Sequence, residues 1–300
     1  MAMKGIRFFY LCSLCFVFVV SVSLSLSKKI EFILPKRKSF SVSPLPILKN
    51  TSSFPVISAQ GAIIIDDESN VTLFEKDADQ PLLPASTTKI ITALVAMDYY
   101  PQDALLKVGE IKIDGRKMNL QQGETITAEN LLYGLLVYSA NDAAYVLADN
   151  YPGGKETFVK AMNEKASNLG LINTKFSNPA GLDGPRHVST ARDMAHLGQI
   201  AMKDAGFAKI VGTKQIDVSS IDGRLIHKLT NVNELLGEVK GVLGVKTGWT
   251  QNARENLITY VDRDGHKVIL ALLGSQDRFG ETKELINWIF ANYEWKEVKL

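Results

Sequence analysis

The sequence predicts an α+β fold, with one antiparallel sheet built from both termini of a domain, flanked by helices and joined to a mostly helical lobe. Short apolar segments of strand character occur over residues 59–75 and return over residues 242–273, and the stretch between them has the spacing of helices. A sheet face and a helix face each need an apolar partner, so this order favours one sheet covered by helices.

The first predicted elements are a β-hairpin and a buried helix. Residues 59–66 contain three consecutive isoleucines, and residues 71–75 return after a polar turn. Residues 86–99 are apolar around much of the helix circumference, which is typical of a helix that is buried on most sides.

Three further helices are predicted over residues 128–138, 155–169 and 190–201. Thr127 and Ser189 are the expected N-cap residues of the first and the third. A hydroxyl at that position accepts a hydrogen bond from a backbone N–H that has no partner within the helix.

The C-terminal part returns to strands, over residues 242–247, 256–261 and 267–273. The last two flank the turn Asp262-Arg263-Asp264-Gly265, in which glycine allows a positive φ. An amphipathic helix over residues 281–293 completes the pattern.

Residues 1–27 are expected to be a signal peptide or an N-terminal membrane anchor. An apolar run from Ile6 to about Leu26 follows Lys4 and Arg7. The Ser-rich end of the run favours a cleaved signal, whereas about 20 apolar residues are also enough to span a bilayer. In both cases we expect an exported protein, periplasmic or otherwise extracytoplasmic, and in the second case one anchored to the cytoplasmic membrane by its N-terminus.

Residues 28–55 are expected to form a Pro-rich, basic linker, and residues 56–300 one catalytic domain. Both cysteines, Cys12 and Cys15, precede the linker, so the domain is expected to have no disulfide and no thiol chemistry. The net charge of +2 and the lack of a nucleic-acid motif argue against a nucleic-acid partner.

The four histidines have no metal-ligand spacing, so no metal and no cofactor is expected. One of them, His187, follows Gly184 in a loop and is expected at the surface.

Three short motifs with the chemistry of a serine acyltransferase follow one another along the chain. They are Ser86-Thr87-Thr88-Lys89, Ser139-Ala140-Asn141 and Lys246-Thr247-Gly248. Each is weak alone, but the order S-x-x-K, S-x-N, K-T-G is the signature set of penicillin-recognising enzymes.

The spacing of Ser86 and Lys89 suits a nucleophile and its base. Side chains three residues apart share one face of a helix, and a serine hydroxyl needs a base to become a nucleophile. Lysine is a base only when neutral, and its ordinary pKa of about 10.4 must be lowered by burial and by a second cation. Lys246 is the expected second cation.

The other motif residues suit substrate binding and proton transfer. Ser139 is expected to relay a proton to the leaving group, and Asn141 to offer its amide to a substrate carbonyl. Lys246 and Thr247, at the end of a strand, suit a carboxylate. Gly248 lets a ligand approach closely, and the backbone N–H groups of Trp249 and Ser86 are candidates for an oxyanion hole.

A longer collinear pattern surrounds the three motifs. Its segments are Ala85-Ser86-Thr87-Thr88-Lys89, Leu131-Leu132-Tyr133-Gly134-Leu135-Leu136, Ser139-Ala140-Asn141-Asp142-Ala143-Ala144, Asn178-Pro179-Ala180-Gly181-Leu182, Ser189-Thr190-Ala191-Arg192-Asp193 and Val245-Lys246-Thr247-Gly248-Trp249-Thr250. Over roughly residues 56–295 the chain resembles the low-molecular-mass penicillin-binding, serine-type D-alanyl-D-alanine carboxypeptidases.

The resemblance implies a β-lactamase/transpeptidase-like fold with the active site between sheet and helical lobe. It implies removal of the terminal D-Ala from the pentapeptide stems of peptidoglycan, covalent binding of β-lactams, and a role in cell wall biogenesis and cell shape. By position, Ser86 matches the nucleophile and Lys89 its base. The other two motifs match those of the family, and Arg278 matches an arginine that holds the substrate carboxylate.

Two departures and three alternatives accompany this resemblance. Ala140 stands where glycine is frequent, and Arg254 is a bulky cation expected near the cleft. A D,D-endopeptidase acting on cross-links shares the chemistry. A β-lactamase is less favoured, because the only near match to its glutamate motif begins at Glu164 inside a predicted helix. An inactive cell-wall binding protein is least favoured, because every motif residue is present.

Overall fold

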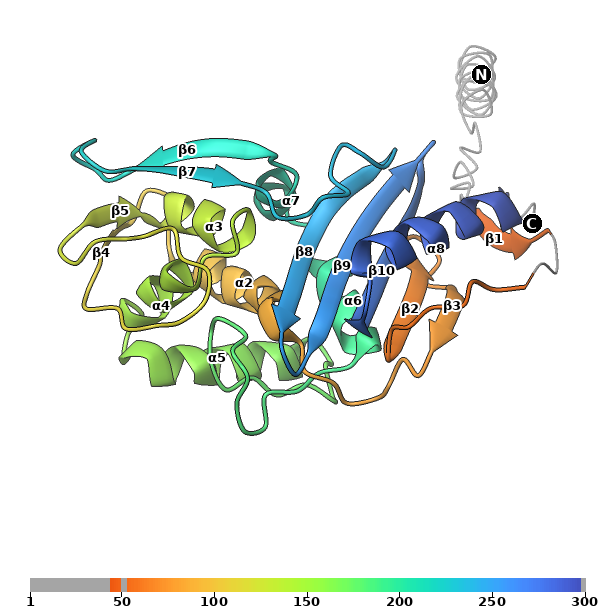
Figure 1. Ribbon diagram of the computed structural model, residues 1–300, viewed down its shortest axis with the longest axis horizontal. Coiled ribbons are helices and arrows are strands. Elements are labelled where there is room, and N and C mark those ends of the chain that lie inside the picture. The colour runs from red at the N-terminus through yellow and green to blue at the C-terminus, as the bar shows by residue number, and fades with distance from the viewer. Residues whose placement is uncertain (1–43, 50–52, 298–300) are drawn as a thin grey trace, which may run out of the picture. The chain divides into compact units, whose positions relative to one another are not determined.

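The centre of the structure is a five-stranded antiparallel sheet with the strand order β3-β2-β10-β9-β8 (Figure 1). The computed structural model describes residues 44–49 and 53–297. The N-terminal hairpin joins the C-terminal strands through the pairing of β2 with β10, so the expected assembly from both termini is confirmed. The strands are β2 (Gly61–Asp66), β3 (Thr72–Lys76), β8 (Val242–Thr250), β9 (Arg254–Arg263) and β10 (His266–Ser275).

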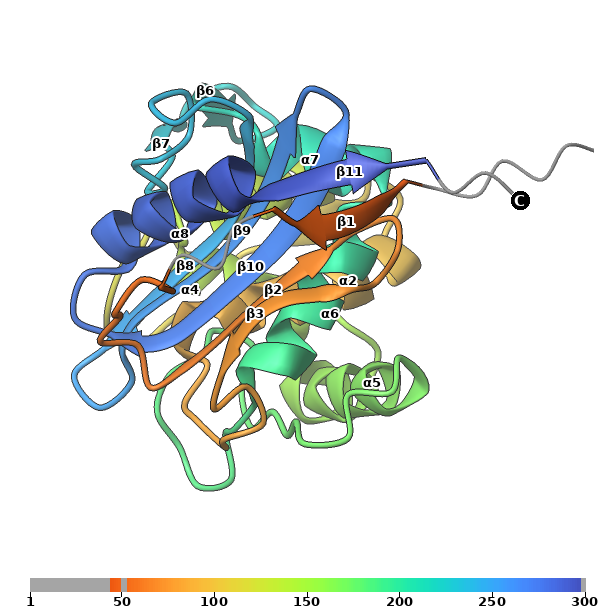
Figure 2. The same ribbon diagram turned by 90° about the vertical axis from the view of Figure 1, so that its right-hand side faces the viewer.

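Both faces of the sheet are buried, because alternate residues of each strand contact different helices. Ile64 and Leu270 belong to the apolar cluster that contains Leu285 of α8 (Arg278–Asn292). Ile63 belongs to the cluster on the other face, with α6 (Ala191–Ala201). Figures 1 and 2 show α8 and α6 on opposite faces of the sheet.

A helical lobe lies beside the β8 edge of the sheet (Figure 1). Its central helix α2 packs against the helices around it, and all of its residues from Lys89 to Ala96 are buried, as predicted from its apolar circumference. A short 3-10 helix, η1, leads directly into α2. The elements of the lobe are η1 (Ala85–Thr88), α2 (Lys89–Tyr99), α3 (Ala128–Leu136), α4 (Asn141–Asp149) and α5 (Gly154–Asn168).

Several small elements were not predicted from the sequence. Two small two-stranded antiparallel sheets and a short helix lie outside the central sheet. They are β4 (Leu105–Lys107) with β5 (Thr125–Thr127), β6 (Gln215–Ser219) with β7 (Ile226–Thr230), and α7 (Ala205–Val211).

A further pair of strands joins β1 (Leu45–Leu48) to β11 (Tyr293–Lys296) near the C-terminus. The expected linker over residues 28–55 therefore includes a strand of the fold. This is a correction, whose cause is that strand β11 offers backbone hydrogen bonds to β1.

One of the two expected helix caps is confirmed and the other is wrong. Thr127 Oγ1 accepts a hydrogen bond from the N–H of Asn130 at 3.2 Å. At α6 the cap is Thr190, whose Oγ1 accepts from the N–H of Asp193 at 3.1 Å. Ser189 lies one residue too early, because its backbone is paired with Leu82 in an isolated antiparallel bridge.

The predictions for residues 1–27, including both cysteines, lie outside the described residues. Among residues 44–49 and 53–297, no helix has both the length and the apolar character needed to cross a bilayer.

Candidate active site

A cleft of about 480 Å³ lies where β8 and η1 meet the junction of α3 with α4. This volume falls in the range of small-ligand sites. Lys89 and Lys246 lie buried beneath it and are almost inaccessible to solvent. The structure thus brings the three motifs together. The sequence-predicted residues that line the cleft are Ser86, Ser139, Asn141, Thr247, Gly248, Trp249 and Arg278.

Ser86 and Lys89 are in direct contact. The short 3-10 helix η1 continues into α2 at Lys89, which puts the two side chains on one face, with Lys89 Nζ 2.9 Å from Ser86 Oγ. Lys89 Nζ also donates to Asn141 Oδ1 at 2.8 Å and to the carbonyl of Ala180. The amine is therefore held at the serine hydroxyl by two fixed acceptors.

Burial lowers the pKa of Lys89 to about 7, because the charged ammonium loses its hydration. Asp142 opposes this change and Arg116 adds to it. Arg116, which the sequence did not single out, is thus a nearby cation acting on Lys89, a role that the sequence assigned to Lys246. Burial, and then the charge of Lys89, hold the pKa of Lys246 well below its ordinary value.

The second motif fills the gap between α3 and α4. Ser139 has a φ of +63°, and its Oγ accepts a hydrogen bond from Lys246 Nζ at 2.8 Å. Asn141 uses both ends of its amide, since Oδ1 accepts from Lys89 while Nδ2 donates to the carbonyl of Asp114 at 2.8 Å. Asn141 therefore links Lys89 to the loop before β5, besides any contact that it makes with a substrate.

The third motif lies on β8, the edge strand next to η1. Lys246 Nζ contacts Ser139 Oγ and the carbonyl of Thr247, at 2.8 Å and 3.0 Å. A Cβ atom on Gly248 would lie 3.1 Å from the amide nitrogen of Ser86. A side chain at this position would crowd η1. Glycine thus permits the close approach of β8 to η1, in addition to the approach of a ligand that the sequence suggested. Trp249 follows at the rim of the cleft and is 62% exposed.

Arg278 places a guanidinium at the end of the cleft next to Gly248. It is the first residue of α8, and its Nη1 donates to the carbonyl of Gly248 at 3.1 Å. Its Nε is buried without a hydrogen-bond partner among the described residues. Burial lowers the pKa of Arg278, and Arg116 contributes in the same direction. This geometry suits an arginine that receives a carboxylate.

The loop over residues 177–187, whose role the sequence did not predict, closes the site from the other side. Gly181 has a φ of +82°, and a Cβ there would lie 1.9 Å from the carbonyl oxygen of Ala85. The chain can pass this close to η1 only with glycine. The neighbouring carbonyl, that of Ala180, accepts from Lys89.

The expectation that His187 lies at the surface is wrong, because only 2% of it is exposed. Its Nδ1 accepts from the N–H of Ser177 at 3.0 Å, so Nε2 carries the proton toward Thr88 Oγ1, 2.9 Å away. Burial lowers the pKa of His187 to about 4. The neutral ring ties this loop to the S-x-x-K segment, a contact over 99 positions of sequence that no local pattern reveals.

Two other residues lie outside the cleft. Arg254 is exposed at the start of β9 and does not line the cleft, whereas Gln251 does. The expectation that Arg254 borders the site is thus not met, because the turn before β9 directs it elsewhere. Glu164 is on α5, where its carboxylate lies 3.6 Å from Lys160 Nζ, and it does not line the cleft.

Comparisons with known proteins agree with this geometry. The family described as D-alanyl-D-alanine carboxypeptidase, Peptidase_S11, matches residues 48–277. The D-alanyl-D-alanine carboxypeptidase DacF of Bacillus subtilis is 31% identical over 79% of this chain and 63% of its own length, so the chain spans less than two thirds of that relative. DacB2 of Mycobacterium tuberculosis is 33% identical over 78% of this chain and 82% of its own.

Among solved structures, the Streptomyces K15 DD-transpeptidase is similar over its whole length. The TM-score is 0.76 at 32% identity, and the match covers 80% of this chain and 100% of that one. The antiparallel sheet between helices is thus the β-lactamase-like fold of these proteins. On the family match and these relatives, the chain belongs to Peptidase_S11, the family of serine-type D-alanyl-D-alanine carboxypeptidases.

Proposed function

We propose that this protein is a serine-type D-alanyl-D-alanine carboxypeptidase that removes the terminal D-Ala of peptidoglycan pentapeptide stems through an acyl-serine intermediate. The observation that carries the proposal is the contact of Lys89 Nζ with Ser86 Oγ at 2.9 Å, within a cleft that has Arg278 at one end. A neutral lysine at a serine hydroxyl provides a base, and an arginine provides the partner for a terminal carboxylate.

Acylation begins when Ser86 Oγ attacks the carbonyl carbon of the bond between the two D-Ala residues. The hydroxyl proton passes to Lys89 Nζ, and the backbone N–H groups of Ser86 and Trp249 stabilise the oxyanion. Thr247 and Arg278 hold the terminal carboxylate, which fixes the register of the peptide along β8.

The intermediate then collapses and the C–N bond breaks. The leaving nitrogen takes a proton from Ser139 Oγ, and Lys246 resupplies that proton through their hydrogen bond of 2.8 Å. The proton that Lys89 took from Ser86 then passes to Lys246, so that Lys89 is neutral again before deacylation. Deacylation reverses the sequence, since Lys89 takes a proton from water, the resulting hydroxide attacks the ester, and Ser86 regains its proton. The products are D-Ala and a shortened stem peptide.

The same site accounts for covalent binding of β-lactam antibiotics. Ser86 opens the lactam ring, and no leaving group departs. Among the described residues no Asp or Glu lines the cleft, so no carboxylate is available to activate water against the penicilloyl ester. The opened ring also stays attached to the acyl group and occupies the place that a departing D-Ala would leave to water, so Lys89 cannot activate water there. We therefore expect a long-lived penicilloyl-enzyme, which separates this protein from a β-lactamase.

The proposal also includes the place of action. Export by residues 1–27, as a cleaved signal or as an anchor in the cytoplasmic membrane, puts the catalytic domain of residues 56–300 outside the cytoplasm, where its substrate is found. The apolar run between Ile6 and Leu26 supports this part.

The experiment that tests the proposal is release of free D-alanine from a pentapeptide stem by the purified chain. We expect release by the wild type and none by Ser86→Ala, with Ser167→Ala, an exposed serine on α5, as the matched control. A cross-linked stem dimer incubated in parallel identifies an endopeptidase. Cleavage of the dimer without release from the pentapeptide would contradict the carboxypeptidase assignment.

A further inference from the structure

The charged side chains that line the cleft are both arginines. Arg278 and Arg116 are its only charged lining residues among the described positions, and no carboxylate lines it. Lys89 and Lys246 add positive potential from below, and Arg116 lowers the pKa of both. A cleft of one sign attracts anions. One arginine is accounted for by the terminal carboxylate of the substrate, and the second is not.

The guanidinium of Arg116 is available to a ligand. Arg116 is exposed, and its side chain makes no hydrogen bond and no ion pair in the part of the chain that the structure describes. The guanidinium lies over the ring of Tyr138, with Cζ 5.2 Å from the ring centroid. Stacking on an aromatic face orients the planar fork while its N–H groups stay free to donate.

The backbone at Arg116 is fixed to the second motif. The N–H of Asn141 donates to the carbonyl of Arg116 at 2.8 Å, and Asn141 Nδ2 donates to the carbonyl of Asp114 at 2.8 Å. Between them, Gly115 has a φ of +87°, and a Cβ there would lie 2.7 Å from Asn141 Nδ2. The loop is thus attached to Asn141 on both sides of Gly115, the residue that precedes Arg116.

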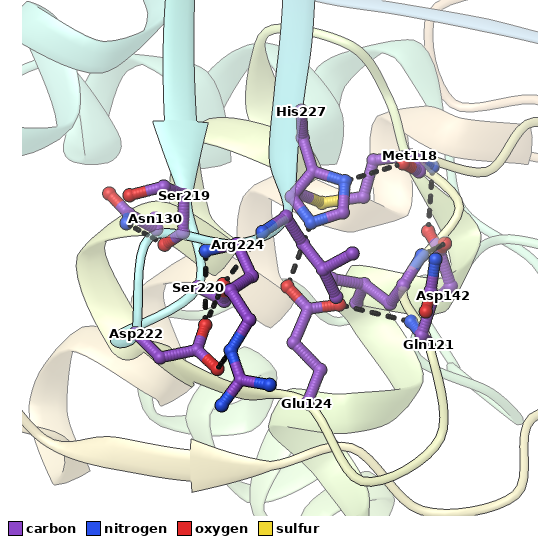
Figure 3. A network of polar contacts seen from close by, with 12 residues as sticks. Met118, Gln121, Glu124, Asn130, Asp142, Ser219, Ser220, Asp222, Arg224 and His227 are labelled. Atoms are coloured by element: carbon purple, nitrogen blue, oxygen red, sulfur yellow. Dashed lines mark hydrogen bonds and ion pairs between the residues drawn. The ribbon is translucent and has the colours of Figure 1, made fainter.

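A second set of contacts holds the remainder of the same loop (Figure 3). Asp142 Oδ1 accepts from the N–H of Met118 at 3.0 Å. His227 bridges the loop, with Nδ1 2.9 Å from the carbonyl of Met118 and Nε2 2.7 Å from Glu124 Oε1. These side chains are buried, so Arg116 projects from a pre-organised loop.

We propose that Arg116 binds a second carboxylate of the stem peptide, and so selects acyl donors with a free side-chain carboxylate over the same peptides carrying a carboxamide. Arg278 is fixed to β8 at Gly248, on the sheet side of the cleft, whereas Arg116 comes from the lobe side, next to Asn141. Two guanidinium groups on opposite walls match a ligand with two separated anions. This inference rests on the proposed carboxypeptidase function.

The test uses two synthetic peptides that end in diaminopimelate-D-Ala-D-Ala and differ only in the side-chain carboxylate, which is free in one and amidated in the other. The wild type should prefer the free carboxylate by roughly tenfold in kcat/KM, as expected for one charge-assisted contact at an exposed site. The preference should lie mainly in KM, because the contact is remote from the scissile bond.

Arg116→Gln should remove this preference, and Arg116→Lys should restore part of it, since lysine keeps the charge and loses the fork. Lys117→Gln is the matched control, because Lys117 is the exposed neighbour that does not line the cleft. It should keep the wild-type preference. An unfolding midpoint equal to that of the wild type shows that each variant is folded.

Three results would overturn the inference. The first is equal kcat/KM for the two peptides with the wild type. The second is an equal loss on both peptides in Arg116→Gln, which would assign Arg116 to the terminal carboxylate or to the lysines. The third is loss of the preference in Lys117→Gln. Failure of the wild type to release D-Ala from either peptide would instead contradict the carboxypeptidase function itself.

Discussion

Lys89 is a fully buried lysine. Its surroundings explain why the fold tolerates a buried amine and how that amine could act as a base. A buried ammonium is costly unless it is paired, and the cost is reduced when the amine is neutral. In the neutral state Nζ donates two hydrogen bonds, to Asn141 Oδ1 and the carbonyl of Ala180, and keeps one lone pair. Nζ also contacts Ser86 Oγ, so in the neutral state the lone pair is left for the hydroxyl that loses its proton in the proposed mechanism.

The pKa of Lys89, lowered to about 7, predicts a pH dependence of acylation. The base must be neutral, so the second-order rate of acylation by benzylpenicillin should rise by about tenfold per pH unit well below pH 7 and level off above it. Arg116→Gln removes a charge that lowers the pKa of Lys89, so its midpoint should move to higher pH. Stopped-flow acylation from pH 5 to 9 measures both.

A rate that is constant from pH 5 to 9 would contradict the assignment of Lys89 as the base. A midpoint that moves to lower pH in Arg116→Gln would contradict the electrostatic effect of Arg116. Lys117→Gln serves as the control, since its side chain lies outside the cleft.

At the scale of elements, η1 is confined between β8 and the loop over residues 177–187. A Cβ on Gly248 would lie 3.1 Å from the amide nitrogen of Ser86, and one on Gly181 would lie 1.9 Å from the carbonyl oxygen of Ala85. Because the backbone approaches this closely at both glycines, β8 and the loop restrict where η1 can lie. The position of Ser86, the proposed nucleophile, therefore depends on these contacts between elements.

Gly181→Ala should abolish acylation, because the added methyl group forces the loop and η1 apart and withdraws the carbonyl of Ala180 from Lys89. The matched control is Gly170→Ala. Gly170 has nearly the same backbone, with a φ of +76° against +82°, but nothing lies within 4 Å of its Cβ position. It should lose about 1 kcal/mol of stability from the left-handed backbone and acylate at the wild-type rate.

Two quantities are measured for both variants: the rate of acylation by benzylpenicillin and the free energy of unfolding in urea. Equal acylation by the two variants would show that the close approach at Gly181 does not position Ser86.

The elements differ in how well the sequence predicts them. Strands β2 and β10 of the central sheet are predicted because they are buried over most of their length and mostly apolar, as in Ile63 to Ile65. Strand β1 is not, because it contains Pro46, lies in a Pro-rich segment, and exists only through its pairing with β11. Hairpin β6–β7 alternates buried and exposed residues, but it is short and mostly polar.

At the scale of the whole molecule, the site is assembled from three parts of the fold. Ser86 and Lys89 come from η1 and α2, Ser139 and Asn141 from the junction of α3 with α4, and the third motif from β8. The packing of β8 against η1 and of the helices around α2 brings them together. The order of the motifs predicts this convergence only through the resemblance to a family, since local patterns contain no distances between them.

What the sequence could not predict are the residues that act through long-range contacts. Arg116 belongs to no motif, and its place in the cleft depends on Asn141, 25 positions later in the numbering of the chain. His187 looks like a loop histidine, and only its contact with Thr88 makes it part of the site. Such roles follow from tertiary packing, which cannot be predicted from the spacing of residues within a short motif.

The central claim is that Ser86 is the nucleophile of a serine D,D-peptidase, and intact-protein mass spectrometry after incubation with benzylpenicillin tests it most directly. Ring opening adds the whole antibiotic, so the account predicts one adduct of the full mass of benzylpenicillin on the wild type and on Ser167→Ala, and none on Ser86→Ala. An adduct that persists on Ser86→Ala, or its absence from the wild type, would contradict the claim.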